Sequence, residues 1–172
     1  NGKCGKDRCG RSNGQSVRPG LPVKQSITLK PTGTIGGHEY VDLGLPSGLK
    51  WATCNIGANS PEEYGDYFEW GAIRNNWCGY IDAKGNLTKT RDVARADWGS
   101  TWRIPTANEI EELQKNTTTE WIVYNGVYGY LVKSKRNGNC IFLPAGGRIS
   151  GNSVYFDGEY GFYWSSTPHD EN

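Results

Sequence analysis

Residues 97–113, DWGSTWRIPTANEIEEL, have the most strongly determined local structure in the chain. Pro105 keeps the residue before it extended, because that residue is sterically excluded from the helical region. Thr106 and Glu109 have the spacing of a capping box, in which each side chain accepts a hydrogen bond from the other residue's backbone N–H. The stretch therefore predicts a helix over residues 107–115.

Apolar spacing predicts how this helix packs and where a second one lies. Ile110 and Leu113 are three positions apart, so they share one helical face, which we expect to lie in the core. A shorter helix is predicted over residues 90–98, TRDVARADW, because Val93, Ala94 and the residues up to Trp98 have helical spacing.

Most of the remaining chain consists of short β-prone runs separated by turn sequences. The predicted strands cover residues 25–29, 40–43, 49–54, 120–124, 127–134, 140–143, 154–156 and 161–165. Asn125-Gly126 is the strongest hairpin sequence among them, and the strand over 140–143 extends that hairpin to a three-stranded meander. Asp157-Gly158 is expected to join the last two strands. Antiparallel strands with two short helices indicate an α+β fold class.

Composition limits the class of protein. The chain has 172 residues, enough for one domain of ordinary size, and its net charge of +1 gives no reason to expect nucleic acid as a partner. No apolar run approaches the roughly 18 residues of a membrane span, so no membrane span is predicted. There is no methionine, which indicates a processed mature protein or a fragment.

The five cysteines are an odd number, so at least one stays unpaired if the others pair. A disulfide between Cys4 and Cys9 is the simplest local pairing, and free thiols are the alternative, because spacing alone does not establish bridge geometry.

Several long phrases carry a resemblance to a known family. They are EYVDLGLPSGLKWATCNIGA (39–58), EEYGDYFEWG (62–71), WRIPT (102–106), GYLVKSKRNGNCIFLPAGG (129–147) and YWSST (163–167). In this order they resemble the Fibrobacter succinogenes major paralogous domain family of bacterial surface proteins. The resemblance implies a C-type-lectin-like fold with two short helices and long loops over residues 37–172, an extracellular or cell-surface location, and no established biochemical activity.

Residues 1–36 differ from the rest in being rich in Gly, Lys, Arg, Ser and Pro, which on composition indicates a tail or linker. Within them, the segment from Arg11 to Pro19 resembles the closing strand of the same family, which normally follows YWSST. Two interpretations are open. The segment is the end of a preceding tandem copy, or it adds as a strand to a neighbouring copy by homotypic strand exchange.

Catalysis and metal binding have weak support in the sequence. The two histidines, His38 and His169, are expected in exposed loops, and Ser165 or Ser166 with His169 and Asp170 is too local to form a catalytic triad. RIPTANEIE (103–111) resembles a phrase of the formylglycine-generating enzymes, which share the lectin-like fold, but those enzymes use a cysteine pair near the chain end that this chain lacks.

Calcium bound through Asp157 and Glu159 is conceivable, because loop carboxylates suit hard cations. However, the phrases that mark calcium-dependent sugar-binding lectins are absent. We therefore predict no enzyme activity, no metal and no cofactor.

Recognition by aromatic, glycine-rich loops is the leading functional prediction. Five tryptophans on regular elements are expected to be structural core residues: Trp51, Trp98, Trp102, Trp121 and Trp164. The candidate ligand-binding residues fall into two clusters: Trp77, Tyr80 and Asp82, and then Asn152, Tyr155, Asp157, Glu159 and Tyr160. The alternative for Trp77 and Tyr155 is packing in the core.

The expected ligand is a glycan or a protein. Two other functions stay open: a self-assembling structural role, and a lectin-like variable protein of a diversity-generating retroelement, whose composition GNSVYFDGEYGFYW (151–164) resembles.

Overall fold

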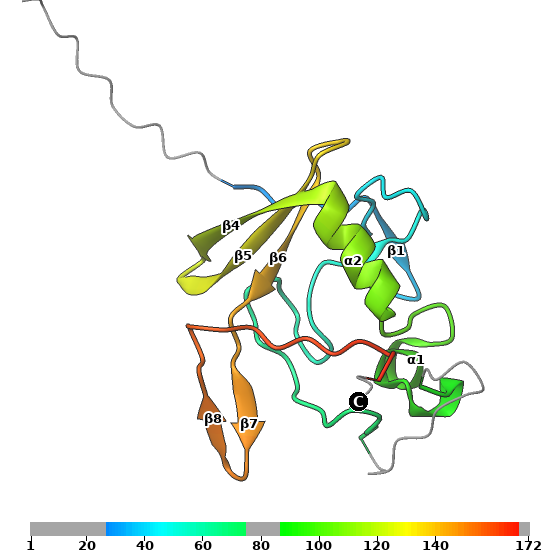
Figure 1. Cartoon of the computed structure of the whole chain (residues 1–172), viewed down its shortest axis with the longest axis vertical. Coiled ribbons are helices and arrows are strands. Elements are labelled where there is room, and N and C mark those ends of the chain that lie inside the picture. Colours follow the sequence, from blue (N-terminus) through cyan, green and yellow to red (C-terminus); the bar gives the residue numbers. More distant parts are fainter. Residues whose placement is uncertain (1–26, 75–86, 169–172) are drawn as a thin grey trace, which may run out of the picture.

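The structure, a computed structural model, describes residues 27–74 and 87–168. It has the predicted α+β composition, with antiparallel pairing in each described sheet (Figure 1). The described strands are β1 (Gly33–Ile35), β2 (His38–Val41), β3 (Trp51–Ala52), β4 (Thr117–Tyr124), β5 (Val127–Ser134), β6 (Cys140–Pro144), β7 (Arg148–Ser150) and β8 (Ser153–Tyr155). The helices are α1 (Val93–Trp98), which follows a short 3-10 turn at Lys89–Arg91, and α2 (Ala107–Asn116).

The core lies between α2 and the meander β4-β5-β6. Leu113 of α2 packs with Val132 of β5 and Ile141 of β6. The segment that follows β2 completes this cluster with Leu43 and Leu45, and Leu43 is fully buried. Ile110, predicted to share the core face, is only half-buried, so one residue of the predicted pair anchors the helix.

The meander forms as its turn sequences predict. Tyr124 pairs with Val127, which leaves Asn125-Gly126 as a two-residue loop. Both loop residues have positive φ, 48° at Asn125 and 87° at Gly126, as the turn that matches strand twist requires. The first strand begins at Thr117, three residues before the predicted start, because it follows directly on the last turn of α2.

The strands predicted over residues 40–43 and 49–54 are confirmed in part, as β2 and β3, which pair with Tyr40 opposite Ala52. β1, which was not predicted from the sequence, pairs with β2 through a turn at Gly36 and Gly37. The strand predicted over residues 25–29 is wrong in its described part, because residues 27–29 have no regular structure.

The predicted last hairpin, residues 154–156 with 161–165, is wrong. β8 pairs instead with β7, with Ser150 opposite Ser153 around the two-residue loop Gly151-Asn152. Gly151 has a φ of 60° and closes this tighter turn. After β8 the chain turns at residues 156–160, and Gly161 makes only an isolated parallel bridge to Gly147.

A bidentate ion pair fixes the start of α2. The capping box is present as predicted: the Glu109 N–H donates to Thr106 Oγ1 at 3.4 Å, and the Thr106 N–H donates to Glu109 Oε2 at 2.8 Å. The Arg103 guanidinium, a partner that the sequence did not predict, donates Nη1 to Oε2 at 2.7 Å and Nη2 to Oε1. Arg103 thus holds Glu109 in the rotamer that caps the helix.

This ion pair predicts a specific loss of stability in acid. Hydrogen bonds from Arg103, together with the N–H of Thr106, lower the pKa of Glu109 from 4.5 to about 2. Because the folded-state pKa is depressed, the stabilisation is fully present above pH 4.5 and is lost as the pH falls toward 2. Because solvent screens this partly exposed ion pair, its contribution to the free energy of unfolding is about 1–2 kcal/mol.

Glu109→Gln should therefore destabilise the protein by about this amount at pH 7 and by much less at pH 2, measured by urea unfolding. Glu111→Gln is the matched control, since Glu111 makes only an exposed i,i+4 pair with Lys115 at 3.2 Å and should change stability by a few tenths of a kcal/mol. An equal loss for Glu109→Gln at both pH values would contradict the assignment.

Candidate functional site

Two of the phrases that carry the family resemblance, residues 62–71 and 163–167, are joined by reciprocal tryptophan hydrogen bonds. Trp70 donates its indole N–H to the Ser165 carbonyl at 2.8 Å. Trp164 donates in the opposite direction, to the Phe68 carbonyl, also at 2.8 Å. The phrases 62–71 and 163–167, about a hundred residues apart in the chain, therefore form one structural unit.

The same C-terminal phrase also holds the start of α2. The Ser166 N–H donates to the Pro105 carbonyl at 2.7 Å, and Thr167 Oγ1 accepts from the Ala107 N–H at 3.3 Å. Thr167 thus satisfies one of the helix N–H groups that have no partner within the helix.

The phrases 39–58 and 129–147 are linked in the same way. Ser134 donates its hydroxyl to the Leu43 carbonyl at 2.6 Å, and the side-chain amides of Asn137 and Asn139 both donate to the Asp42 carbonyl. The phrases that carry the resemblance are therefore hydrogen bonded to one another, and most of their residues build the scaffold.

Part of the core-facing side of the β4–β5 pair is uncovered and forms an exposed apolar surface. Directly paired residues of an antiparallel sheet share a face. Toward α2 this face is buried, as at Val132, but farther along the same two strands it becomes exposed. The exposed part consists of Trp121 (40%), Val123 (54%), Tyr128 (50%) and Tyr130 (46%).

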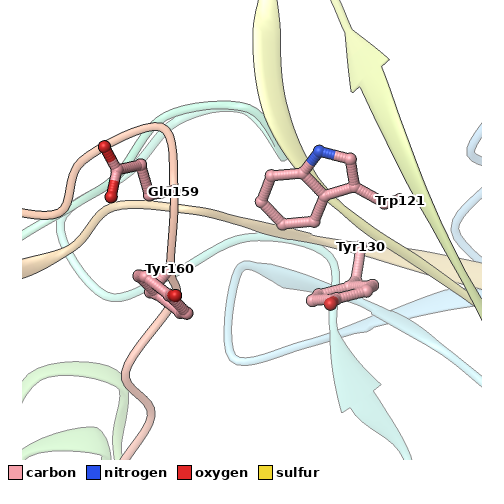
Figure 2. Close-up of a pocket in the computed structure, with 5 residues that line it drawn as sticks. Trp121, Tyr130, Glu159 and Tyr160 are labelled. Atoms are coloured by element: carbon pink, nitrogen blue, oxygen red, sulfur yellow. The ribbon is translucent and has the colours of Figure 1, made fainter.

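A shallow cleft of about 390 Å³ lies between this face and the segment that follows β8. Figure 2 shows Trp121 and Tyr130 on the sheet side and Glu159 and Tyr160 on the facing segment. The rings of Trp121 and Tyr130 meet edge to face, with centroids 4.9 Å apart. The cleft is therefore lined by three aromatic rings and by Glu159, whose carboxylate is directed away from Trp121 and Tyr130 in Figure 2.

The facing segment is held by backbone hydrogen bonds to the chain between β6 and β7. The Gly147 N–H donates to the Tyr160 carbonyl at 2.7 Å, and the Gly158 N–H donates to the Ala145 carbonyl at 2.7 Å. A Cβ at Gly147 would lie 2.2 Å from the Tyr155 carbonyl oxygen, so only glycine permits this close approach. Glu159 and Tyr160 consequently project from a fixed backbone.

Side-chain contacts add to this support. The Tyr163 hydroxyl donates to the Pro144 carbonyl at 2.8 Å, and burial of the hydroxyl end raises the pKa of Tyr163 to about 12, although 43% of the residue is exposed. The Tyr160 ring also packs edge to face against Phe156 at 5.8 Å, while the Arg148 guanidinium lies 5.7 Å from the centroid of the Phe156 ring.

The predicted site residues have different outcomes. Glu159 and Tyr160 line the cleft. Asn152, Tyr155 and Asp157 are exposed on or beside β8 but are not among the lining residues. The first predicted cluster, Trp77, Tyr80 and Asp82, lies outside the described residues, as does the segment from Arg11 to Pro19.

The sequence-based interpretation missed the sheet side of the cleft. Trp121 was expected in the core, which is wrong, and Tyr130 was treated only as a strand residue. Trp164 is likewise 55% exposed rather than buried, although its indole N–H is hydrogen bonded. The alternation of large side chains at Trp121, Val123, Tyr128 and Tyr130 around Asn125-Gly126 was the available signal, because the hairpin register places all four on one face.

A second groove, of about 580 Å³, lies between α2 and the C-terminal segment 163–168. Trp70 and Trp164 line it, and both use their indole N–H groups to hold the scaffold. The first cleft is therefore the better candidate binding site.

Four described residues with side chains suited to catalysis, His38, Ser165, Cys54 and Cys140, have structural surroundings. His38, predicted in an exposed loop, lies instead in β2 and stacks on Trp98 with ring centroids 4.1 Å apart. Ser165 donates its hydroxyl to the Thr167 carbonyl at 2.6 Å. Cys54 and Cys140 are free thiols, and burial raises the pKa of each, which disfavours the reactive thiolate.

Within residues 27–74 and 87–168, no three His, Cys, Asp or Glu side chains are grouped so that they could hold a metal ion. None of the helices in these two ranges has the length and apolarity needed to cross a membrane.

Comparisons of the chain with protein-family models, with curated proteins and with solved structures found no match.

Proposed function

We propose that this chain is a non-enzymatic recognition module that binds a carbohydrate in the cleft formed by Trp121, Tyr130, Glu159 and Tyr160. The observation that carries the proposal is the exposure of three aromatic rings around one cleft, which Glu159 also lines. We place the module outside the cell or on its surface, where the resembling family occurs.

The chemistry of the cleft fits a sugar. A pyranose ring has an apolar face made of C–H groups and a rim of hydroxyls, so it suits an aromatic surface next to a hydrogen-bond acceptor. Trp121 and Tyr160 offer large rigid rings that lose little conformational entropy on binding. The Glu159 side chain has two acceptor oxygens, to which the hydroxyl groups of a sugar can donate.

Binding without turnover is supported by the composition of the cleft. Glycoside hydrolysis generally requires two carboxyl groups on opposite sides of the scissile bond. Among the described residues that line the cleft, Glu159 is the one carboxylate.

We further propose that the α+β arrangement is C-type-lectin-like. Two short helices, antiparallel sheets and long irregular connections support this, as do the hydrogen bonds that tie together the phrases resembling the Fibrobacter succinogenes major paralogous domain family. In this arrangement most residues of these phrases form the scaffold, and the residues that line the cleft, including Tyr130 of the phrase 129–147, determine the ligand.

Substitution of either large ring should abolish most of the binding. In a glycan-array screen followed by calorimetric titration of the best sugar, Trp121→Ala and Tyr160→Ala should each weaken binding at least about tenfold, because each removes a stacking surface. Tyr155→Ala is the matched control, since Tyr155 is also an exposed tyrosine (49%) but does not line the cleft.

Unchanged circular dichroism would show that each variant is folded. A sugar that binds with equal affinity to the wild type and to both cleft variants would exclude this site, and the absence of any binding sugar would exclude the carbohydrate class. Binding of a protein ligand, sensitive to the same two substitutions, would keep the site and change the ligand.

A further inference from the structure

β4 is an edge strand with one side unpaired. The sheet order is β4-β5-β6, so within the described part of the chain β4 has one hydrogen-bonded neighbour, β5. It pairs with β5 over its whole length, from Thr117 opposite Ser134 to Tyr124 opposite Val127. An eight-residue edge of this kind is a template for another strand.

The hairpin geometry identifies the backbone groups that are free. Tyr124 and Val127 flank a two-residue loop and therefore form a hydrogen-bonded pair. Because the pattern alternates, Thr118, Glu120 and Ile122 also direct their N–H and C=O groups toward β5. The backbone groups of Thr119, Trp121 and Val123 point outward instead.

The edge has few of the features that normally prevent strand addition. β4 reads TTTEWIVY, with no proline, no lysine and no glycine, and with one charged residue, Glu120. Its register with β5 is continuous, without a bulge. Edge strands are usually blocked by such charges, prolines or bulges, so this one is suited to pairing.

We propose that β4 pairs antiparallel with β4 of a second copy, which joins two three-stranded meanders into one six-stranded sheet. The symmetric arrangement presents the same residues from both copies, as a two-fold interface requires. It differs from exchange of the segment from Arg11 to Pro19, because both strands of the new pair belong to the described domain.

Side-chain chemistry distinguishes two of the possible registers. In a two-fold antiparallel pair, one residue lies opposite its own copy, and the two faces of the sheet must match. Centring the pair on Glu120 would place two carboxylates directly opposite each other, which is destabilising. Centring it on Trp121 avoids this contact, since Glu120 then lies opposite Ile122 of the second copy.

The Trp121-centred register also brings exposed aromatic side chains of the two copies together. Cross-strand aromatic pairs stabilise sheets, and Trp121 would lie beside its counterpart on the same face as Tyr130. About six backbone hydrogen bonds would form between outward residues, two at each of three pairs. The clefts of both copies would then open onto one continuous aromatic surface.

Proline at Thr119 tests this pairing. Its ring removes an outward N–H and fills space next to the edge, while the hydrogen bonds to β5 are preserved. In sedimentation velocity, the wild type should form a dimer with increasing concentration, and Thr119→Pro should weaken the dimer by about a hundredfold. Thr119→Ala keeps the N–H and is the control, with the dimer expected to persist.

Amide hydrogen exchange of the wild type provides a readout that needs no variant. The amides of Thr119, Trp121 and Val123 should exchange rapidly at low protein concentration and slowly at high concentration, whereas those of Glu120 and Ile122 should be slow throughout. A monomer at all concentrations would overturn the proposal. So would a dimer that Thr119→Pro leaves intact, or one whose protection appears at residues 11–19 instead of the three outward amides.

Discussion

Leu43→Ala is expected to lower the free energy of unfolding by about 2–5 kcal/mol. Leu43 is fully buried and lies in an irregular segment between β2 and β3, where it packs with Leu113, Val132 and Ile141. Its carbonyl also accepts the Ser134 hydroxyl, so the surrounding backbone is fixed and cannot relax into the space left by the side chain. The cavity should therefore persist, which places the cost toward the upper part of the range.

Urea unfolding followed by tryptophan fluorescence measures this change. The midpoint should fall while the dependence on urea concentration stays the same, because the same surface is exposed on unfolding. Ile149→Ala is the control: Ile149 is 48% exposed on β7, and its truncation should cost about 0.5 kcal/mol or less. Equal losses for the two variants would mean that Leu43 is not a core residue.

Asp92→Ala is expected to cost about 2–3 kcal/mol. Asp92 is buried and caps α1, where its carboxylate accepts from the Arg95 N–H at 3.3 Å. The same carboxylate accepts from the Ile104 N–H at 3.0 Å, twelve residues farther along. Burial raises the pKa of Asp92, while the two N–H donors act in the opposite direction. Removal of the carboxylate would leave both donors without this acceptor.

Two further variants serve as controls for Asp92→Ala. Asp92→Asn keeps one side-chain oxygen as an acceptor and should recover part of the lost stability. Asp157→Ala, at an exposed aspartate, should have little effect on unfolding. If Asp92→Ala were as mild as Asp157→Ala, the carboxylate would not join α1 to the segment that leads into α2.

The parts of the fold that were predicted correctly are those that local rules determine. The capping box and the proline before it define α2 almost to the residue, and Asn125-Gly126 defines the register of β4 with β5. Arg103 was the missing element at the helix, because nothing in a sequence shows that an arginine six positions away folds back onto Glu109.

The predictions were wrong where two local patterns competed, or where tertiary contacts determine the burial of a residue. Asp157-Gly158 was a plausible hairpin turn, but Gly151-Asn152 closes a shorter one, and the later turn redirects the chain toward β6. Trp121 is a large aromatic residue on a β-strand, and such residues are usually expected in the core. Whether it is buried depends on what covers the sheet at that point, and an isolated strand sequence does not contain that information.

Two of the four main cleft residues were predicted from the sequence, and the other two were not. Glu159 and Tyr160 were found because they belong to a glycine-rich aromatic loop, which is a typical site of recognition. Trp121 and Tyr130 come from the middle of a regular hairpin, where sequence reasoning expects packing. Their approach to residues 159–161 depends on the Gly147 contact, which is a long-range feature of the folded chain.

The indole hydrogen bonds between residues 68–70 and 164–165 also bear on how the chain folds. They close loops of 95 and 96 residues, more than half of the 172-residue chain. Closing such loops costs entropy before the contacts repay it, which raises contact order and slows folding. During synthesis, the hydrogen bond between Trp70 and Ser165 can form only after Ser165 has left the ribosome. The new chain therefore gains the stability that this contact provides only after the motif at residues 163–167 has been made.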